Sequence, residues 1–102
     1  MDFYIDIGEY TFVWDENKNQ LNIERHKIEF KEAATVFSDH SAKVDYDEEH
    51  SQYEERFSII GRSDVGNLLM VVHCIREGGV IRLISARKAT KGEEKRYYSI
   101  EF

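Results

Sequence analysis

The apolar segment from Leu68 to Ile75 constrains the fold of this chain more than any other feature. Such an almost continuously apolar run is typical of a strand at the centre of a sheet, buried on both faces. Glu77-Gly78-Gly79 follows it, and glycine readily adopts the positive φ that a tight hairpin turn needs. A second β-like segment, Val80 to Arg87, comes next. The sequence therefore predicts an antiparallel hairpin at the centre of the protein.

Two helices are predicted in the first half of the chain and one at its end. Asp15 can cap a helix from Glu16 to His26, in which Leu21 and Ile23 are apolar. A clearer helix is predicted over residues 30–37, because its apolar residues recur at helical spacing and make one stripe: Phe30, Ala33, Ala34 and Phe37. Residues 90–98 are predicted to form a short third helix.

Further strands complete the expected fold. A strand is predicted from Arg56 to Gly61, and residues 62–67 form the turn that leads to the central strand. Residues 43–46 are expected to form a weak strand, and residues 1–10 contain a loosely alternating edge strand. The fold class is α+β: N-terminal helices, then an antiparallel sheet, then a short C-terminal helix. With 102 residues, the chain is expected to form a single domain over residues 1–102.

Composition narrows the class of protein. No apolar run approaches the length of about 18 residues that a membrane-spanning helix needs. Asp2 and Asp6 stand where a secretory signal would carry basic residues. The single cysteine, Cys74, excludes an internal disulfide and a multi-cysteine zinc site. We therefore expect a cytoplasmic protein that has no membrane contact and needs neither a metal nor a cofactor.

Charge is distributed unevenly along the chain, whose net charge is −6. Residues 39–55 contain seven acidic residues and one basic residue, a net charge of −6. Residues 80–98 contain six basic and two acidic residues, a net charge of +4. A basic segment on an acidic protein forms a localised patch, which would suit one anionic ligand.

Arg82 and Arg87 stand at the two ends of the last predicted strand. A guanidinium donates hydrogen bonds in a planar fork that fits phosphate or carboxylate. Residues of opposite parity lie on opposite faces of a regular strand, so at most one of the two arginines is expected to point into a given site. We choose Arg87, which is followed by the basic helix. Four other cations of the segment are expected to bind the substrate: Arg82, Lys88, Lys91 and Arg96.

His26 and Lys18 are eight residues apart on the first helix, so both can lie on about the same side of it. Imidazole gains and loses a proton near neutral pH, which makes His26 a candidate acid or base. If Arg56 met Arg87 and Lys18, three cations would converge on a phosphate and stabilise charge on its oxygens. In the alternative interpretation, nearby acids simply neutralise these cations: Glu54, Glu55 and Glu93.

An ordered series of short motifs runs through the chain. The series is Phe12-x-Trp14-Asp15-x-x-Lys18, Asn22, His26, Phe30-x-x-Ala33-Ala34-x-Val36-Phe37-x-Asp39, His50-Ser51-x-x-Glu54-Glu55-Arg56, Ile60-Gly61-Arg62-Ser63, Leu69-x-Val71-Val72-His73, Arg82-x-Ile84-Ser85-Ala86-Arg87-x-Ala89-Thr90, Glu93 and Tyr97. In order and spacing it closely resembles the BrnT family of bacterial toxins over about residues 12–98. Residues 1–10 look like an N-terminal addition to the family pattern.

The resemblance implies a fold similar to RelE-type ribonuclease toxins and an RNA-cleaving activity that inhibits translation. It also implies a BrnA-type antitoxin with a ribbon-helix-helix part, so that the toxin would meet operator DNA only through its antitoxin. The polar positions of the family motif are matched by Lys18, His26, Arg56, Arg82 and Arg87. Two positions depart from the pattern: Lys27 replaces the usual glycine, and Glu94 replaces a frequent arginine, which reduces the positive field.

Our leading hypothesis is a metal-independent endoribonuclease. His26 or Lys18 would act as acid or base, Arg87 and Arg56 would hold the phosphate, and Arg82 would assist. The competing hypothesis is an interaction module of little or no activity, which forms a repressor complex with its antitoxin and represses its own operon.

Overall fold

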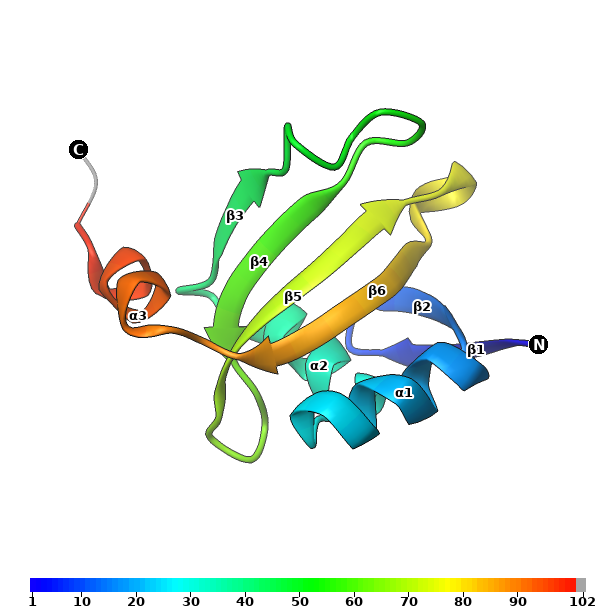
Figure 1. Cartoon of the computed structure of the whole chain (residues 1–102), viewed down its shortest axis with the longest axis horizontal. Helices are drawn as coiled ribbons and strands as arrows, with labels where there is room; N and C mark the ends of the chain where they lie inside the picture. The colour runs from blue at the N-terminus through cyan, green and yellow to red at the C-terminus, as the bar shows by residue number, and fades with distance from the viewer. Residues whose placement is uncertain (101–102) are drawn as a thin grey trace.

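One six-stranded sheet organises the structure, a computed structural model that describes residues 1–100. Residues 101–102 of the predicted domain lie outside the described part. Figure 1 shows the elements, which follow in chain order: β1 (Asp2–Ile7), β2 (Tyr10–Asp15), α1 (Glu16–His26), α2 (Phe30–Thr35), the 3₁₀ turn η1 (Val36–Ser38), β3 (Lys43–Tyr46), β4 (Phe57–Arg62), β5 (Leu68–Ile75), the 3₁₀ turn η2 (Glu77–Gly79), β6 (Ile81–Lys88) and α3 (Lys91–Tyr98).

The strands lie in the order β1-β2-β6-β5-β4-β3, and the fold class is α+β as predicted. The predicted order of helices before strands is wrong, because β1 and β2 precede α1. The sheet is also mixed: β2 and β6 run parallel, with Phe12 opposite Ile81, whereas the other neighbours are antiparallel. Parallel neighbours need a long connection. Here it runs from Asp15 to Ile81, so no local sequence pattern could reveal the pairing.

Most predicted elements are confirmed. The bounds of α1, β3 and β5 agree with the prediction, and β4, β6 and α3 begin one residue later. Gly78 and Gly79 of η2 both have φ of 77°, the positive value expected of the hairpin glycines. The helix predicted over residues 30–37 ends at Thr35, and the chain continues as η1.

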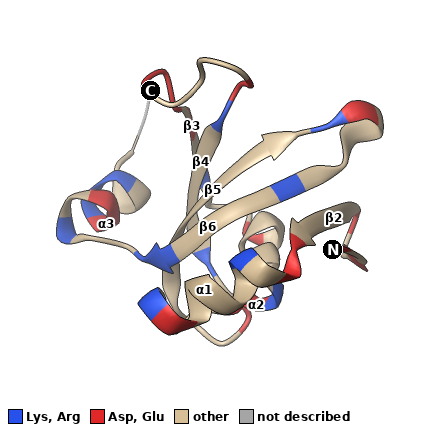
Figure 2. Ribbon diagram, turned by 45° about the vertical axis from the view of Figure 1, so that its right-hand side comes forward, with Lys and Arg blue, Asp and Glu red and all other residues tan. Residues whose placement is uncertain are grey.

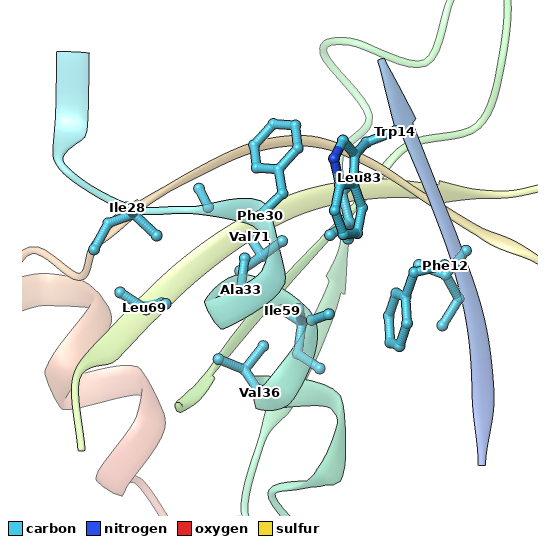
Figure 3. Close-up of a cluster of buried hydrophobic side chains, with 13 residues drawn as sticks. Phe12, Trp14, Ile28, Phe30, Ala33, Val36, Ile59, Leu69, Val71 and Leu83 are labelled. Carbon is cyan, nitrogen blue, oxygen red and sulfur yellow. The ribbon is translucent and has the colours of Figure 1, made fainter. Parts of the chain in front are cut away.

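The core lies between the sheet and α2, as Figure 3 shows. Phe12 and Trp14 of β2 enter it from one side, and Phe30 from α2 lies edge-on to Trp14, with ring centroids 6.0 Å apart. The strand β5 was expected to be buried on both faces, and this is wrong. Leu69 and Val71 are fully buried, but Met70 and Val72, which face the other side, are only half-buried.

Those two sides of the sheet differ in what covers them. We call the side of Leu69, Val71, Leu83 and Ala86 the covered face, because these residues belong to the core with α2. We call the side of Met70, Val72, Arg82, Ser85 and Arg87 the open face. The helix α3 lies over one margin of the open face, beside β3 and β4 (Figure 1). Lys43 of β3 holds it there by donating to the carbonyl of Tyr97, 2.8 Å away.

The helix α1 buries polar rather than apolar side chains. Leu21 is 47% exposed, and the residues that α1 buries are Asn19 and Asn22. The Asn19 side-chain oxygen accepts from the backbone N–H of Phe30 at 2.8 Å, which ties α1 to the start of α2. Hydrogen bonds satisfy these buried amides, as burial of polar groups requires. None of the helices within residues 1–100 is long and apolar enough to cross a membrane.

Candidate active site on the open face

A β-bulge in β6 decides which side chains reach the open face. Val72 of β5 pairs with Ser85, but the next residue, His73, pairs with Leu83, so Ile84 has no partner in β5. An extra residue of this kind breaks the regular alternation of a strand. Leu83 and Ala86 therefore both face the core.

Arg82 and Arg87 consequently lie on the same side of the sheet, the open face. The prediction that they lie on opposite faces is wrong, because it assumed an unbroken strand. Arg82 pairs with Cys74 and Arg87 with Met70, two residues of one parity on the regular strand β5. These partners are four positions apart in β5, which corresponds to about 13 Å along the strand.

Arg87 is held by a carboxylate from α3. Its two terminal nitrogens donate to the two oxygens of Glu93 at 2.7 and 2.9 Å, and this hydrogen bonding lowers the pKa of Glu93. Glu93 also accepts from the backbone N–H of Thr90, whose hydroxyl accepts from the backbone N–H of Glu93. This capping box fixes the start of α3. The T-x-x-E spacing of Thr90 and Glu93 was a sequence signal for it.

Asn22 is a residue of this region whose role sequence reasoning missed. Its side-chain nitrogen donates to the carbonyl of Ala86 at 2.8 Å, and its oxygen accepts from the backbone N–H of Ala86 at 3.0 Å. The same nitrogen donates to the carbonyl of Ile28 at 2.9 Å. The Asn22 amide thus pairs with β6 as a neighbouring strand would. It fixes the backbone one residue before Arg87.

Arg82 is also held by a carboxylate, this time from β1. Its two terminal nitrogens donate to the two oxygens of Asp2 at 3.1 and 3.0 Å, and the hydrogen bonding lowers the pKa of Asp2. Both residues line a shallow hollow of about 410 Å³ together with Tyr4, Val13 and Arg76. The partner of Arg82 therefore comes from the segment that looked like an addition to the family pattern.

Arg96 repeats this arrangement on α3. Its guanidinium donates to both oxygens of Asp45 in β3, at 3.2 and 2.8 Å. Three predicted arginines of the basic segment thus each hold a carboxylate through two hydrogen bonds: Arg82, Arg87 and Arg96. Lys88 and Lys91, two of the three lysines of the segment, are exposed. Figure 2 shows basic residues in blue at the end of β6 and along α3.

Arg56 does not join Arg87, so the predicted convergence of three cations is wrong. Arg56 immediately precedes β4, whose first residue pairs with His73, whereas Arg87 pairs with Met70 near the other end of β5. Arg56 is four positions from Ile60, which lies opposite Met70, and this offset corresponds to about 13 Å along the sheet. Arg56 lies instead at the same end of the sheet as Arg82.

Lys18 and His26 reach the region from α1, on the covered side, and both are exposed. They lie four residues before and after Asn22, on about the same side of the helix. Figure 1 shows α1 running toward the end of β6, where Arg87 lies. His26 is at that end, whereas Lys18 is about 12 Å farther back along the helix axis.

The chemistry of the open face follows from its forked ion pairs. A guanidinium that holds a carboxylate through two hydrogen bonds has the geometry that also fits two phosphate oxygens. An incoming phosphate would therefore compete with Glu93, Asp2 or Asp45 for the same donors. Within residues 1–100, no three histidine, cysteine, aspartate or glutamate side chains are grouped as metal ligands would be.

Comparison with known proteins bears on what such a face does. Residues 14–93 match the model of a family described as the ribonuclease toxin BrnT of type II toxin–antitoxin systems. The chain belongs to this family. It is also similar to the crystal structure, at 1.1 Å resolution, of the ribonuclease toxin BrnT from Brucella abortus. The TM-score is 0.60 and the identity 26%, with 76% of this chain and 94% of that chain covered. No curated protein matches the sequence.

The expected membership of the BrnT family is confirmed, over a shorter range than residues 12–98. The strand β1 precedes the matched residues, whereas β6, Thr90 and Glu93 fall within them. Type II systems pair a toxin with an antitoxin, so the family implies such a partner. The expected similarity to RelE-type toxins is not confirmed by either comparison.

Proposed function

We propose that this BrnT protein is a metal-independent endoribonuclease whose reacting phosphate binds at Arg87. The observation that carries the proposal is the placement of the Arg87 fork on the open face. The hydrogen bonds of Asn22 to Ala86 fix the backbone beside it. Because this backbone is fixed, the Arg87 guanidinium can stabilise developing charge once Glu93 has been displaced, which is the basis of electrostatic transition-state stabilisation.

In the proposed reaction, an RNA 2′-hydroxyl loses its proton to a base and attacks the adjacent phosphorus. The bond from phosphorus to the 5′-oxygen breaks, the leaving oxygen takes a proton from an acid, and a 2′,3′-cyclic phosphate remains. Arg87 stabilises the charge on the non-bridging oxygens after the phosphate replaces Glu93. To serve as acid or base, His26 must reach the phosphate around the end of β6, to which it lies nearer than Lys18.

The remaining cations bind the rest of the RNA backbone. Arg82 and Arg56, at the far end of the open face, are too distant from Arg87 to hold the same phosphate. These two arginines would bind a neighbouring part of the RNA. Arg96 and Lys91 of α3 extend the surface on the other side of Arg87, whereas Lys88, which pairs with Leu69, projects from the covered side of the sheet. Contacts of this kind supply affinity with little sequence preference.

The proposed partner is a BrnA-type ribbon-helix-helix antitoxin that neutralises the toxin and carries the complex to operator DNA. The toxin would then act in the cytoplasm, where translation takes place.

The competing function, an interaction module without activity, is also supported by a specific observation. Because Arg82, Arg87 and Arg96 all hold carboxylates, the open face has little unbalanced positive charge, as an inactive interaction module would.

Incubating the purified protein with RNA in EDTA, with and without its antitoxin, separates the two functions. We expect cleavage products with cyclic phosphate ends and their loss when antitoxin is added. Arg87→Ala should lower the cleavage rate by about 10²–10³-fold and relieve growth arrest. Arg25→Ala, at an exposed arginine of α1, removes the same charge and should leave the rate unchanged.

Circular dichroism melting must show that Arg87→Ala is folded, because the substitution also leaves Glu93 without its ion pair. A folded Arg87→Ala protein with full activity would exclude the proposed role. Absence of cleavage by the wild-type protein at every salt concentration would favour the interaction module.

A further inference from the structure

The two edges of the sheet are the strands β1 and β3. An edge strand presents backbone N–H and C=O groups that can pair with another chain. Only β3 lies within residues 14–93, the part of the chain that matches the family. A surface that serves a partner common to the family is therefore sought at β3.

The hydrogen-bond register shows which groups β3 directs outward. The backbone N–H of Asp47 donates to the carbonyl of Arg56 at 2.8 Å, so this pair is hydrogen-bonded. Bonded and non-bonded pairs alternate in an antiparallel ladder. Asp45 therefore bonds to β4, whereas the N–H and C=O groups of Val44 and Tyr46 point away from it. No residue that the structure describes pairs with this side of β3.

The side chains of the same two residues are also left uncovered. Both side chains lie on the covered side of the sheet, because they alternate with residues that β3 turns to the open face. Val44 is nevertheless 55% exposed and Tyr46 is 51% exposed. Tyr46 rests with one side of its ring against Phe57, with ring centroids 5.6 Å apart. An apolar pair beside outward backbone groups is the arrangement that strand addition uses.

Charge identifies the kind of occupant. Beyond Tyr46 the chain continues into Asp47, Glu48 and Glu49, and the two glutamates are exposed. A second copy of β3 paired edge to edge would bring two such acidic segments together. An extended segment with positive charge would instead be attracted to them. The edge thus fits a basic strand with alternating apolar residues.

We propose that the antitoxin docks on the open edge of β3 by adding a basic extended strand, bonded to the backbone of Val44 and Tyr46. The inference rests on the proposed pairing with an antitoxin and adds where the antitoxin binds. It assigns this contact to the acidic half of the chain. The basic segment of residues 80–98, with its arginines already bound to carboxylates, is left for RNA.

Residue-resolved hydrogen exchange tests the proposal directly. The probe is the protein encoded by the reading frame next to the toxin gene, bound to the full chain. The amides of Val44 and Tyr46 should exchange at least about tenfold more slowly in the complex than in the free toxin, since a new hydrogen bond protects each. A stable complex in which both amides exchange as in the free toxin would overturn the docking site alone. Failure to form any complex would overturn the antitoxin pairing as well.

Two matched pairs of variants measure the contact by affinity. Val44→Pro removes an outward donor but no bond to β4, whereas Val44→Ala keeps the donor and shortens the side chain. We expect antitoxin affinity to fall about tenfold for Val44→Pro and less for Val44→Ala. Glu49→Lys should weaken binding about threefold or more at low salt, and Glu24→Lys on α1 should not. Equal effects of Glu49→Lys and Glu24→Lys would contradict the charge argument.

RNA cleavage by the free toxin serves as the control for folding and for the proposed function. The side chains of Val44 and Glu49 belong to neither the phosphate site nor its supports, so these variants should cleave RNA at the wild-type rate. Lost cleavage together with a lowered melting temperature would show that a variant is misfolded, and the exchange measurement on the wild-type chain then decides.

Discussion

The covered and open faces of the sheet are held together by different forces. On the covered face, Leu69, Val71 and Leu83 are buried in a continuous apolar core. On the open face, arginines are paired with carboxylates at the surface, where ion pairs contribute little to stability. The covered face therefore provides most of the stability of the fold. The arginines of the open face can exchange their carboxylate partners for a ligand with little loss of stability.

Leu83→Ala should have the largest effect on stability. The side chain is 1% exposed, so its removal leaves a cavity and should lower the free energy of unfolding by about 2–5 kcal/mol. Ile84→Ala, at the half-exposed bulge residue beside it, should cost about 1 kcal/mol. Urea unfolding measures both. Equal losses would mean that the bulge does not divide the two faces as described.

His73 gives the covered face a pH dependence. It lies between the rings of Phe37 and Phe57, and burial lowers its pKa to about 4. The unfolded chain binds a proton near pH 6.5, so stability is complete above that value and falls as the pH drops toward 4. The loss attributable to His73 should reach about 3 kcal/mol. His73→Phe should remove this part of the pH dependence, while His40→Phe, at an exposed histidine, should retain it. Parallel pH profiles of all three proteins would contradict the assignment.

Asn22→Ala should lower the free energy of unfolding by about 2 kcal/mol, because the Ala86 backbone loses its partners in a buried place. Asn17→Ala, on the exposed side of the same helix, should stay within about 0.5 kcal/mol of wild type. Thermal and urea unfolding provide the measurement. If the two variants were equally stable, the pairing of α1 with β6 would not contribute to the fold.

On the open face, Asp2→Asn should have the smallest effect on folding and a visible effect on ligand binding. It frees the Arg82 fork, so RNA affinity at low salt should rise about threefold. Asp6→Asn makes the same charge change in the same strand, but Asp6 accepts from Thr11 and not from Arg82. Binding isotherms at two salt concentrations measure the RNA affinities of the two variants. Identical affinities for the two variants would show that the Arg82 pair has no part in binding.

Local patterns were sufficient for much of the fold. The cap residue Asp15 predicted α1, the spacing of apolar residues predicted α2, and the glycines of η2 marked the central hairpin. The departure at Lys27 also has a structural explanation. Its φ is 61°, the left-handed conformation that favours glycine at the end of a helix, which accounts for the glycine usual in the family pattern.

What could not be predicted depends on contacts distant in sequence. Asp2 and Arg82 are 80 residues apart, and Asn22 and Ala86 are 64 apart, so no local pattern connects them. The bulge at Ile84 has no composition of its own, yet it reversed the expected side of one arginine. The side of the sheet on which a residue lies depends on every residue between it and a known reference point.

Because Ile84 is unpaired, the number of residues in β6 decides on which side of the sheet the second arginine lies. Deleting one residue between Arg82 and Arg87 would restore even alternation and turn the second arginine toward the helices. Most point substitutions in this interval would disturb the position of the second arginine less than deletion of one residue. Among relatives, the interval between the two arginines should accordingly vary less in length than in residue type. In this strand, the number of residues places the two arginines on one side of the sheet, and no single side chain does so.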